Sequence, residues 1–268
     1  MTRPTLRVVA LVPAHDEGPR IGAVVEAAAR HLAVLVVDDG STDDTAARAQ
    51  AAGARVIRQR PNRGKGAALR TGFADALEQG FDAVVTLDGD GQHDPAEIPR
   101  FLAALGAMDE PPDLVIGCRD FRRMPPVRRL ANVLGRRAFS WAVGRDIPDN
   151  QSGYRLVGRR LMVEMLTSDE SGFEFEVEML TTCLHRGWRL AWVPIRTIYG
   201  GPSHIRPTHH LRQFIRATLI ARRAMRAGRE AATARPKVRQ RRAPPAASGG
   251  LRPRDPSGDH QKVTTRRA

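Results

Sequence analysis

The segment DGDGQ at 88–92 directly follows an apolar run and carries two carboxylates separated by a single glycine. Two carboxylates at the end of a buried strand repel each other unless a countercharge lies between them. A divalent cation supplies that charge, and Mg²⁺ or Mn²⁺ suits carboxylate and amide oxygens. The loop is no EF-hand, because its sixth and twelfth positions hold His93 and Pro99 instead of Gly and Glu. We therefore predict a metal site at Asp88 and Asp90, with simple loop capping as the alternative.

Two other polar segments suit a nucleotide. NRGKG at 62–66 is glycine-rich and basic, so its backbone amides and Lys65 can face a phosphate or the edge of a base. It lacks the GxxxxGK[S/T] pattern of a P-loop, and an ordinary turn at a helix start is the alternative. Asp38 and Asp39 end another apolar run, where a carboxylate either accepts hydrogen bonds from a nucleobase or ribose hydroxyl or caps a helix.

Short apolar runs alternating with Ala-rich stretches must position these segments. The runs are rich in Val, Ile and Leu without strict alternation, which is typical of parallel strands buried on both faces. They lie at 6–12, 33–37, 55–57, 83–87 and 114–116. Helices are predicted between them at about 19–31, 43–53, 64–80 and 95–107. This order predicts an α/β fold with an open, mainly parallel sheet flanked by helices.

Three of the predicted strands end in polar or acidic clusters, at 15–17, 38–39 and 88–90. Ligands in open α/β sheets bind outside the carboxyl ends of the strands. Capping explains any one cluster, but the occurrence of all three favours a binding site at one rim of the sheet.

The second half of the chain is less regular. It contains predicted helices near 127–143 and 173–187, a strand at 189–195 and a basic amphipathic helix at about 208–228. Beyond 229 the chain has almost no large apolar residues, which is typical of a disordered segment. We therefore expect a catalytic domain over 1–228 and a basic tail rich in Pro, Ala and Arg over 229–268.

The net charge of +14 is concentrated near the end of the chain. Residues 221–268 hold 14 Lys and Arg against 3 Asp and Glu, so residues 1–220 carry only +3. This near-neutral body argues against a nucleic-acid-binding fold, and no nucleic-acid partner is expected.

Cys118 and Cys183 give neither a disulfide framework nor a zinc spacing. The sequence shows no apolar stretch of about 18 residues and no signal-peptide core, so a cytoplasmic location is expected.

Seven segments, taken in order and spacing, resemble one family. PAHDE (13–17), VVDDGSTDDT (36–45), NRGKGAALRTGF (62–73) and LDGDGQHDP (87–95) resemble the nucleotide-sugar half of family-2 glycosyltransferases with the GT-A fold. DNQSGYRL (149–156), GFEFEVEML (172–180) and VPIRTIYGGPSHIRP (193–207) resemble the acceptor half of the polyprenol-phosphate branch, which includes dolichyl-phosphate mannosyltransferase. The similarity spans about 6–216.

The resemblance implies a role for particular residues. Those expected to bind the donor nucleotide are Pro13, Glu17, Asp38, Asp39, Lys65 and Asp88. The implied ligands of Mg²⁺ or Mn²⁺ are Asp88, Asp90 and Gln92. Residues expected to bind the acceptor and its phosphate are Arg119, Arg128, Arg129, Ser152 and His204, the last standing where the family often has Lys.

These implied roles predict an inverting, metal-dependent hexosyltransferase. The metal stabilises the leaving diphosphate as a Lewis acid. A lipid phosphate is largely anionic at pH 7 and needs no general base, but it needs cations such as Arg119 and Arg129 to position it. A hydroxyl acceptor instead requires a carboxylate base, for which Asp149 is the first candidate.

Several alternatives stay open at this point. The donor is a nucleoside-diphosphate sugar, and GDP-mannose, UDP-glucose and UDP-N-acetylhexosamine all fit. The expected acceptor is a polyprenyl phosphate at the cytoplasmic membrane face, and a hydroxyl of a glycolipid, glycan or small molecule is the alternative. A nucleotide-sugar-binding protein without turnover is the non-catalytic alternative. The basic helix and tail either bind an anionic membrane surface at the cytoplasmic face or serve only packing and solvation.

Overall fold

The computed structural model describes residues 6–107, 110–124, 126–172, 174–196, 198, 215–216, 218–223 and 225. The residues described belong to one compact unit, Met1–Thr233. The predicted tail at 229–268, its boundary near 228 and most of the predicted helix at 208–228 lie outside the described residues. Where that helix is described, at 215–216, 218–223 and 225, its residues are helical.

A seven-stranded sheet in the order β3-β2-β1-β4-β6-β5-β7 forms the centre of the protein. The strands are β1 (Val8–Ala14), β2 (Val34–Asp39), β3 (Arg55–Gln59), β4 (Ala83–Thr86), β5 (Leu114–Arg119), β6 (Arg155–Gly158) and β7 (Leu190–Ile195). Every neighbouring pair is parallel except the two that β6 makes with β4 and β5. This mainly parallel sheet confirms the predicted α/β class.

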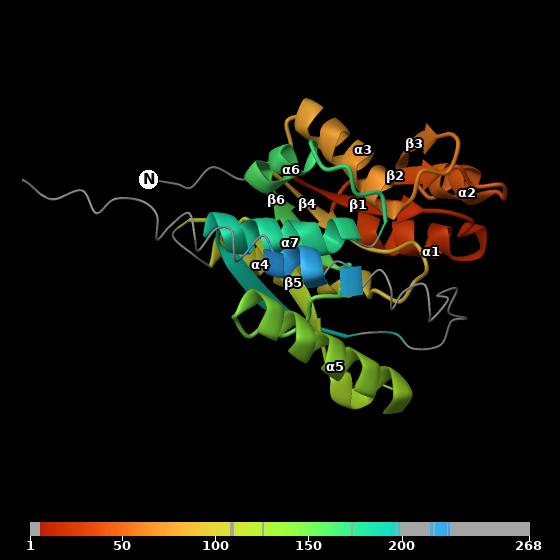
Figure 1. The fold of residues 1–268 in the computed structure, drawn as a ribbon. Helices are drawn as coiled ribbons and strands as arrows, with labels where there is room; N and C mark the ends of the chain where they lie inside the picture. The colour runs from red at the N-terminus through yellow and green to blue at the C-terminus, as the bar shows by residue number, and fades with distance from the viewer. Residues whose placement is uncertain are drawn as a thin grey trace, which may run out of the picture. The chain divides into compact units, whose positions relative to one another are not determined.

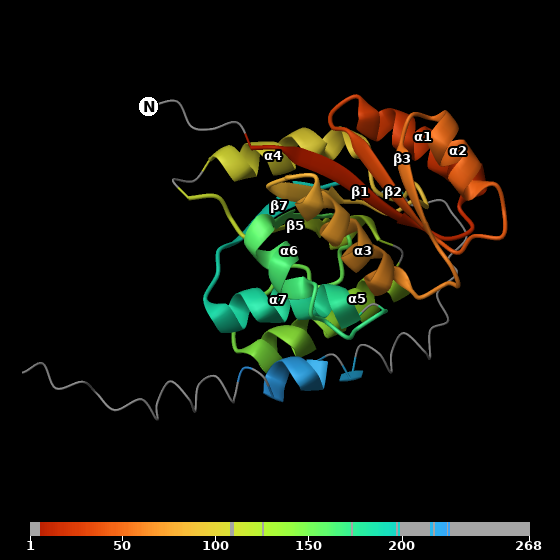
Figure 2. The same cartoon turned by 90° about the horizontal axis from the view of Figure 1, so that it is seen from above.

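Helices cover both faces of the sheet (Figures 1 and 2). One face packs on α1 (Gly18–Ala29), α2 (Thr45–Ala51) and α4 (Ile98–Gly106), which follows the 3₁₀ turn Pro95–Glu97. The other face packs on α3 (Lys65–Glu78), α5 (Pro126–Val143), α6 (Arg159–Met165) and α7 (Glu174–Arg186). A second 3₁₀ turn, Phe121–Arg123, joins β5 to α5.

The two faces explain why the strands lack a polar alternation. In β1, Val9 and Leu11 enter the core beneath α3, whereas Ala10 and Val12 enter the core beneath α1. Successive side chains of a strand point to opposite faces, so a strand covered on both sides is apolar throughout.

The strand β6 and the helix α6 have no counterpart among the elements expected from the sequence. β6 is four residues long and begins with Arg155, so it lacks an apolar run that marks a strand. Because β6 runs antiparallel, its first residue lies at the same rim as the carboxyl ends of β4 and β5. That direction brings the preceding loop, 149–154, to the rim of the sheet where the acidic clusters also lie. Among the described residues, no helix combines the length and apolarity needed to cross a bilayer.

Candidate functional site

The loop after β4 is held in shape by its own side chains. The backbone N–H of Asp88 donates to Nδ1 of buried His93 over 3.0 Å. Asp90 accepts hydrogen bonds from the Gln92 backbone at 2.9 Å and from its side-chain Nε2 at 2.6 Å. Gly91 has a φ of 74°, a conformation that glycine adopts without strain. The three predicted metal ligands therefore lie in one ordered loop at the carboxyl end of β4.

The oxygens in this loop fit Mg²⁺ or Mn²⁺. Carboxylate and amide oxygens are hard ligands, and Mg²⁺ typically takes one or two carboxylates together with substrate phosphates and waters. The described residues contain no cluster of three or more acidic, His or Cys side chains that would enclose an ion. The side-chain oxygens of Asp88, Asp90 and Gln92 are thus of the kind that Mg²⁺ or Mn²⁺ binds.

Lys65 is the first residue of α3 and connects this loop to α7. Its Nζ lies 2.6 Å from Asp88 Oδ1 and 3.0 Å from Glu176 Oε1. Burial alone would lower the pKa of Lys65, but the Asp88 and Glu176 carboxylates outweigh it and raise that pKa. Burial raises the pKa of Asp88 less than Lys65 and the neighbouring cationic groups lower it, so the net shift is downward. The pair is therefore charged throughout the physiological pH range.

Asp39 anchors the glycine-rich segment that precedes α3. Its carboxylate accepts hydrogen bonds from the backbone N–H groups of Arg63 and Gly64, both at 2.8 Å, and from the Gln59 side chain. Gly64 has a φ of 93°, and a Cβ there would lie 2.5 Å from the Ser171 carbonyl oxygen. Asp39 therefore acts on the loop that leads into Lys65, and only Gly fits at position 64.

The other predicted donor residues lie at the ends of β1 and β2. Pro13 is a buried residue of β1, and Glu17 precedes α1 and pairs with Arg20. Asp38 is 3% exposed, accepts the Ser41 N–H at 3.0 Å, and lies 3.6 Å from the Arg58 guanidinium. These residues line the same rim as Asp88 because β1 pairs in parallel with both β2 and β4.

Arg119 ends β5 and is held by Asp149. Its Nε and Nη2 donate to the two carboxylate oxygens of Asp149 at 2.7 and 2.9 Å, a bidentate pair. Nη2 also reaches Asn132 of α5 at 3.3 Å. Asp149 is 1% exposed and Arg119 18% exposed, so the guanidinium is the partner that reaches the surface. Asp149 thereby fixes the direction of Arg119.

The loop 149–153 rests on a buried arginine. Arg155 is 0% exposed and donates to the carbonyl oxygens of Asn150, Ser152 and Glu176. Burial lowers the pKa of Arg155 below its usual value, although Glu176 and Asp149 oppose that shift. Ser152 Oγ and Asn150 Nδ2 are buried without a hydrogen-bond partner in the described structure. Arg155 thus ties the loop of Ser152 to the start of α7.

The remaining predicted acceptor residues are placed less fully. Arg129 is exposed on α5. Arg128 is a helical residue of α5, but its side chain lies outside the description, and His204 lies outside the described residues altogether.

Three residues at this site were not predicted from the sequence. Glu176 lies in the quoted segment 172–180 but received no role. It contacts Lys65 although the two residues are more than a hundred positions apart in the sequence. Arg155 and His93 lie inside the quoted segments 149–156 and 87–95, and the histidine directly follows Gln92. Only their place inside those motifs signalled them in advance.

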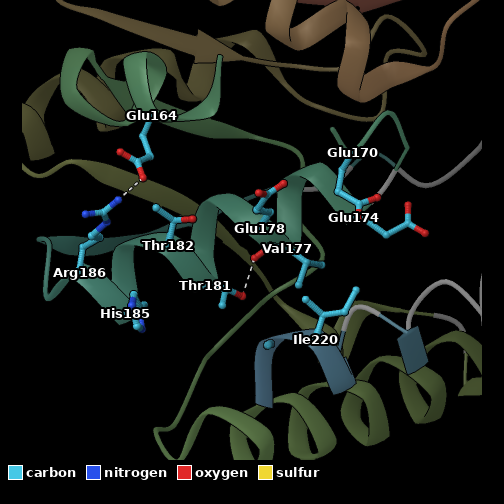
Figure 3. Close-up of a pocket in the computed structure, with 11 residues that line it drawn as sticks. Glu164, Glu170, Glu174, Val177, Glu178, Thr181, Thr182, His185, Arg186 and Ile220 are labelled. Atoms are coloured by element: carbon cyan, nitrogen blue, oxygen red, sulfur yellow. Dashed lines mark hydrogen bonds and ion pairs between the residues drawn. The ribbon is translucent and has the colours of Figure 1, made fainter. Parts of the chain in front are cut away.

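A separate cavity of about 280 Å³ lies on another side of α7 (Figure 3). Its lining includes Glu164, Glu170, Glu174, Glu178, His185 and Ile220. Of the predicted donor, metal and acceptor residues whose side chains the structure describes, none lines this cavity. Helix α7 therefore presents Glu176 to the rim of the sheet and Glu178 to this cavity.

The comparisons with known proteins agree with this geometry. A model of the family described as Glycosyl transferase family 2 matches residues 9–161. The polyprenol monophosphomannose synthase of Mycolicibacterium smegmatis is 32% identical over 211 residues, covering 72% of this chain and 78% of that protein. The undecaprenyl-phosphate mannosyltransferase of Micrococcus luteus is 30% identical over 208 residues, covering 71% of this chain and 83% of that protein.

Solved structures give the fold. Glucosyl-3-phosphoglycerate synthase from Mycobacterium tuberculosis, in complex with Mn²⁺, uridine diphosphate and phosphoglyceric acid, matches with a TM-score of 0.63 at 26% identity. The match covers 81% of this chain and 78% of that one, and the same synthase is also known with Mg²⁺ and uridine diphosphate. The fold is GT-A, as the sequence predicted. Since the family model spans more than half of the chain and both mannosyltransferases match along most of it, the chain belongs to the family-2 glycosyltransferases.

Proposed function

We propose that this enzyme transfers a sugar from a nucleoside diphosphate to the phosphate of a polyprenyl phosphate, with inversion at the anomeric carbon and with a divalent metal ion. The names of the two mannosyltransferase relatives, which point to polyprenol and undecaprenyl-phosphate acceptors, support this acceptor class. GDP-mannose, UDP-glucose and UDP-N-acetylhexosamine are the donors to test.

The pairing of Asp149 is the observation that carries the choice of acceptor. A hydroxyl nucleophile needs a general base, whereas a phosphate monoester is already anionic at neutral pH. Both oxygens of Asp149 are committed to Arg119, and one of them also accepts the Gln151 N–H at 3.0 Å. We assign Asp149 a positioning role for Arg119, and this arrangement favours a phosphate acceptor that binds to arginine.

The donor half of the reaction uses the loops at the ends of β2 and β4. Asp88, Asp90 and Gln92 would hold the cation, which when bound supplies Lewis-acid stabilisation of the leaving diphosphate. Asp39 keeps the loop 62–64 in place beneath the start of α3, where the helix N-terminus favours an anion. Lys65 adds a positive charge at the same point. Arg119, Arg128 and Arg129 hold the attacking phosphate against the repulsion between two anions.

A membrane location fits the surface of α5. Leu130, Leu134 and Trp141 are 62%, 55% and 65% exposed and are spaced so that they share one side of the helix. Nearby, Arg222 lies 3.7 Å above the Trp141 ring, and the exposed Leu219 extends the apolar area. Apolar side chains mixed with arginines suit the interface of an anionic bilayer. We infer peripheral binding at the cytoplasmic face, where a lipid phosphate is presented.

The first experiment is transfer of radiolabelled sugar to a short polyprenyl phosphate, with the three donors and with Mg²⁺ or Mn²⁺. Product extractable into organic solvent, absent with EDTA and with Asp90→Ala, supports the proposal. Donor hydrolysis that needs metal but gives no lipid product would move the acceptor to a hydroxyl compound. Anomeric analysis of the product by NMR tests inversion, and a retained configuration contradicts a single displacement.

One observation favours a second candidate. The glucosyl-3-phosphoglycerate synthase described above was solved with phosphoglyceric acid, which is a small water-soluble compound. The same assay with phosphoglyceric acid in place of the lipid distinguishes the two, because its product stays in the aqueous phase.

A further inference from the structure

Lys65 lies between two carboxylates that differ in access to solvent. The Glu176 side chain is 4% exposed, whereas that of Asp88 is 29% exposed. Only Asp88 belongs to the loop with the predicted metal ligands. Glu176 is thus an inner carboxylate that a soluble ligand does not reach, and Asp88 is the outer one.

A divalent cation and the Lys65 ammonium compete for Asp88. Lys65 Nζ already occupies Oδ1 at 2.6 Å, and two cations on one carboxylate repel each other over a distance at which Coulomb energies are large. Cation binding therefore has to weaken the bond between Lys65 and Asp88. Lys65 is also the first residue of α3, where the helix dipole disfavours a positive charge. The ammonium consequently needs a second carboxylate.

Glu176 is placed to be that second carboxylate. Its Oε1 is already 3.0 Å from Nζ, so Lys65 can shift toward it without crossing a gap. Gly153 leaves room for the pair, because a Cβ there would lie 2.8 Å from Glu176 Oε1 and 2.9 Å from Nζ. Arg155 Nη1 donates to the Glu176 carbonyl and fixes this turn of α7. The Arg155 side chain thus holds the backbone of Glu176 in place, and glycine at position 153 keeps the space that Lys65 and Glu176 share.

We propose that Glu176 is a positioning residue that takes over the Lys65 ammonium when a divalent cation binds Asp88, and so sets the affinity of the metal site. This inference rests on the proposed function, since it requires Asp88 to be a metal ligand. It assigns opposite effects to the two partners. Lys65 competes with the cation, whereas Glu176 relieves that competition by holding Lys65 aside.

The test is a double-mutant cycle in which the Kd of Mn²⁺ alone is measured for each variant. The EPR signal of the free ion reports how much Mn²⁺ remains unbound. Lys65→Met should lower the Kd about fivefold because Asp88 loses its competing cation. Glu176→Gln should raise the Kd about tenfold, because Lys65 then has no second carboxylate to pair with when the cation displaces it from Asp88. In the Lys65→Met background, Glu176→Gln should change the Kd by no more than about twofold, since there is no ammonium to receive.

The matched control is Glu178→Gln, which removes the same charge two residues along α7. Glu178 accepts a hydrogen bond from Ser168 and lines the cavity of Figure 3, so its variant should leave the Kd for Mn²⁺ unchanged. If Glu176→Gln changes the Kd equally in both backgrounds, the Glu176 charge acts on the cation directly and not through Lys65. That result overturns the proposal. A Kd raised by Lys65→Met also overturns it, and that variant decides the matter even if Glu176→Gln fails to fold.

The inference and the proposed function fail in different ways. If Asp88→Asn does not weaken Mn²⁺ binding, the metal site itself is misplaced and both fail. If Mn²⁺ binding depends on Asp88 but the cycle shows no coupling between Lys65 and Glu176, only the inference fails. The melting temperature of each variant, measured by circular dichroism, separates loss of folding from loss of binding.

Discussion

The proposed donor and acceptor sides of the site are built differently. On the donor side, backbone N–H groups of the loop 62–64 donate hydrogen bonds to Asp39. The loop after β4 is held by hydrogen bonds to His93 and Asp90. On the acceptor side, Arg119 is fixed by Asp149, but Arg129 is exposed on α5 beside exposed Leu130. The donor side is thus organised through the backbone, and much of the acceptor side is a surface of side chains.

Under the proposed function, this difference follows from what each side would bind. A nucleoside diphosphate carries its negative charge on a compact diphosphate, and backbone groups on a fixed loop recognise such an anion without being reordered. A lipid phosphate arrives at a bilayer on a long apolar chain, so a cationic and apolar surface suits it better than a closed pocket. Substitutions on the donor side should therefore affect the metal, the donor and stability, whereas those on the acceptor side should affect only the acceptor or the membrane.

The largest expected effect is that of Asp88→Asn. The variant keeps the shape of the side chain but removes the charge shared by the predicted cation and Lys65, so transfer should fall about 10³-fold. Initial rates at saturating donor and metal measure this. A loss of less than tenfold would show that Asp88 is not a metal ligand and would remove the main distinction between the two sides.

The donor side was largely predictable from the sequence because its motifs are local. Its acidic clusters each follow an apolar run, and parallel strands bring their carboxyl ends to one rim. The sequence therefore predicted that Asp39 and Asp88 lie at the same rim without any knowledge of distances. The alternatives for Asp39 could not be decided, since binding a nucleotide and anchoring a loop require the same carboxylate at the same position.

The contacts that cross between the halves could not be predicted. Lys65 meets Glu176 only because α3 and α7 pack on the same face of the sheet. β6 carries no periodic signal, and its antiparallel direction decides that Asp149 faces Arg119. Sequence spacing describes neighbours along a helix or strand, whereas these pairs depend on the order of strands in the sheet.

The next effect is that of Asp39→Asn, which tests whether the donor side is preorganised by its backbone. The amide nitrogen of Asn would face one of the N–H donors of Arg63 and Gly64, leaving it unsatisfied at about 1–3 kcal/mol. We expect the KM for the donor to rise about 30-fold and the KM for the acceptor to stay unchanged. The control is Asp44→Asn, which removes an exposed pair with Arg48 and should be nearly neutral. Equal changes in both KM values would mean that the two sides are not independent.

Arg129→Ala should show the opposite selectivity. Charge-assisted hydrogen bonds to phosphate are worth about 1.5–3 kcal/mol, so the KM for the acceptor should rise about tenfold or more. The KM for the donor should not change. Arg137→Ala, another exposed arginine on α5, is the matched control. A short, water-soluble polyprenyl phosphate is the acceptor of choice, because it keeps membrane binding out of the measurement. Similar losses for both arginines would indicate a general charge effect instead of a phosphate site.

The smallest effect concerns the apolar part of the acceptor side, and it separates membrane binding from chemistry. Leu130→Ser with Leu134→Ser removes two exposed apolar side chains from α5 without touching the donor loops. Each contributes only a fraction of the roughly 1.5–3 kcal/mol of a fully buried leucine, so binding to anionic vesicles should weaken about fivefold. Co-sedimentation with anionic vesicles measures the binding. The same measurement with neutral vesicles shows how much of the binding depends on the arginines. Val163→Ser is the matched control, since Val163 is 53% exposed on α6. Rates with a water-soluble acceptor should be unaffected, because a side chain that contacts only lipid makes no difference once the phosphate is delivered from solution. If vesicle binding is unchanged while those rates fall, Leu130 and Leu134 contact the acceptor and not the membrane, and the apolar surface of α5 is part of the acceptor site.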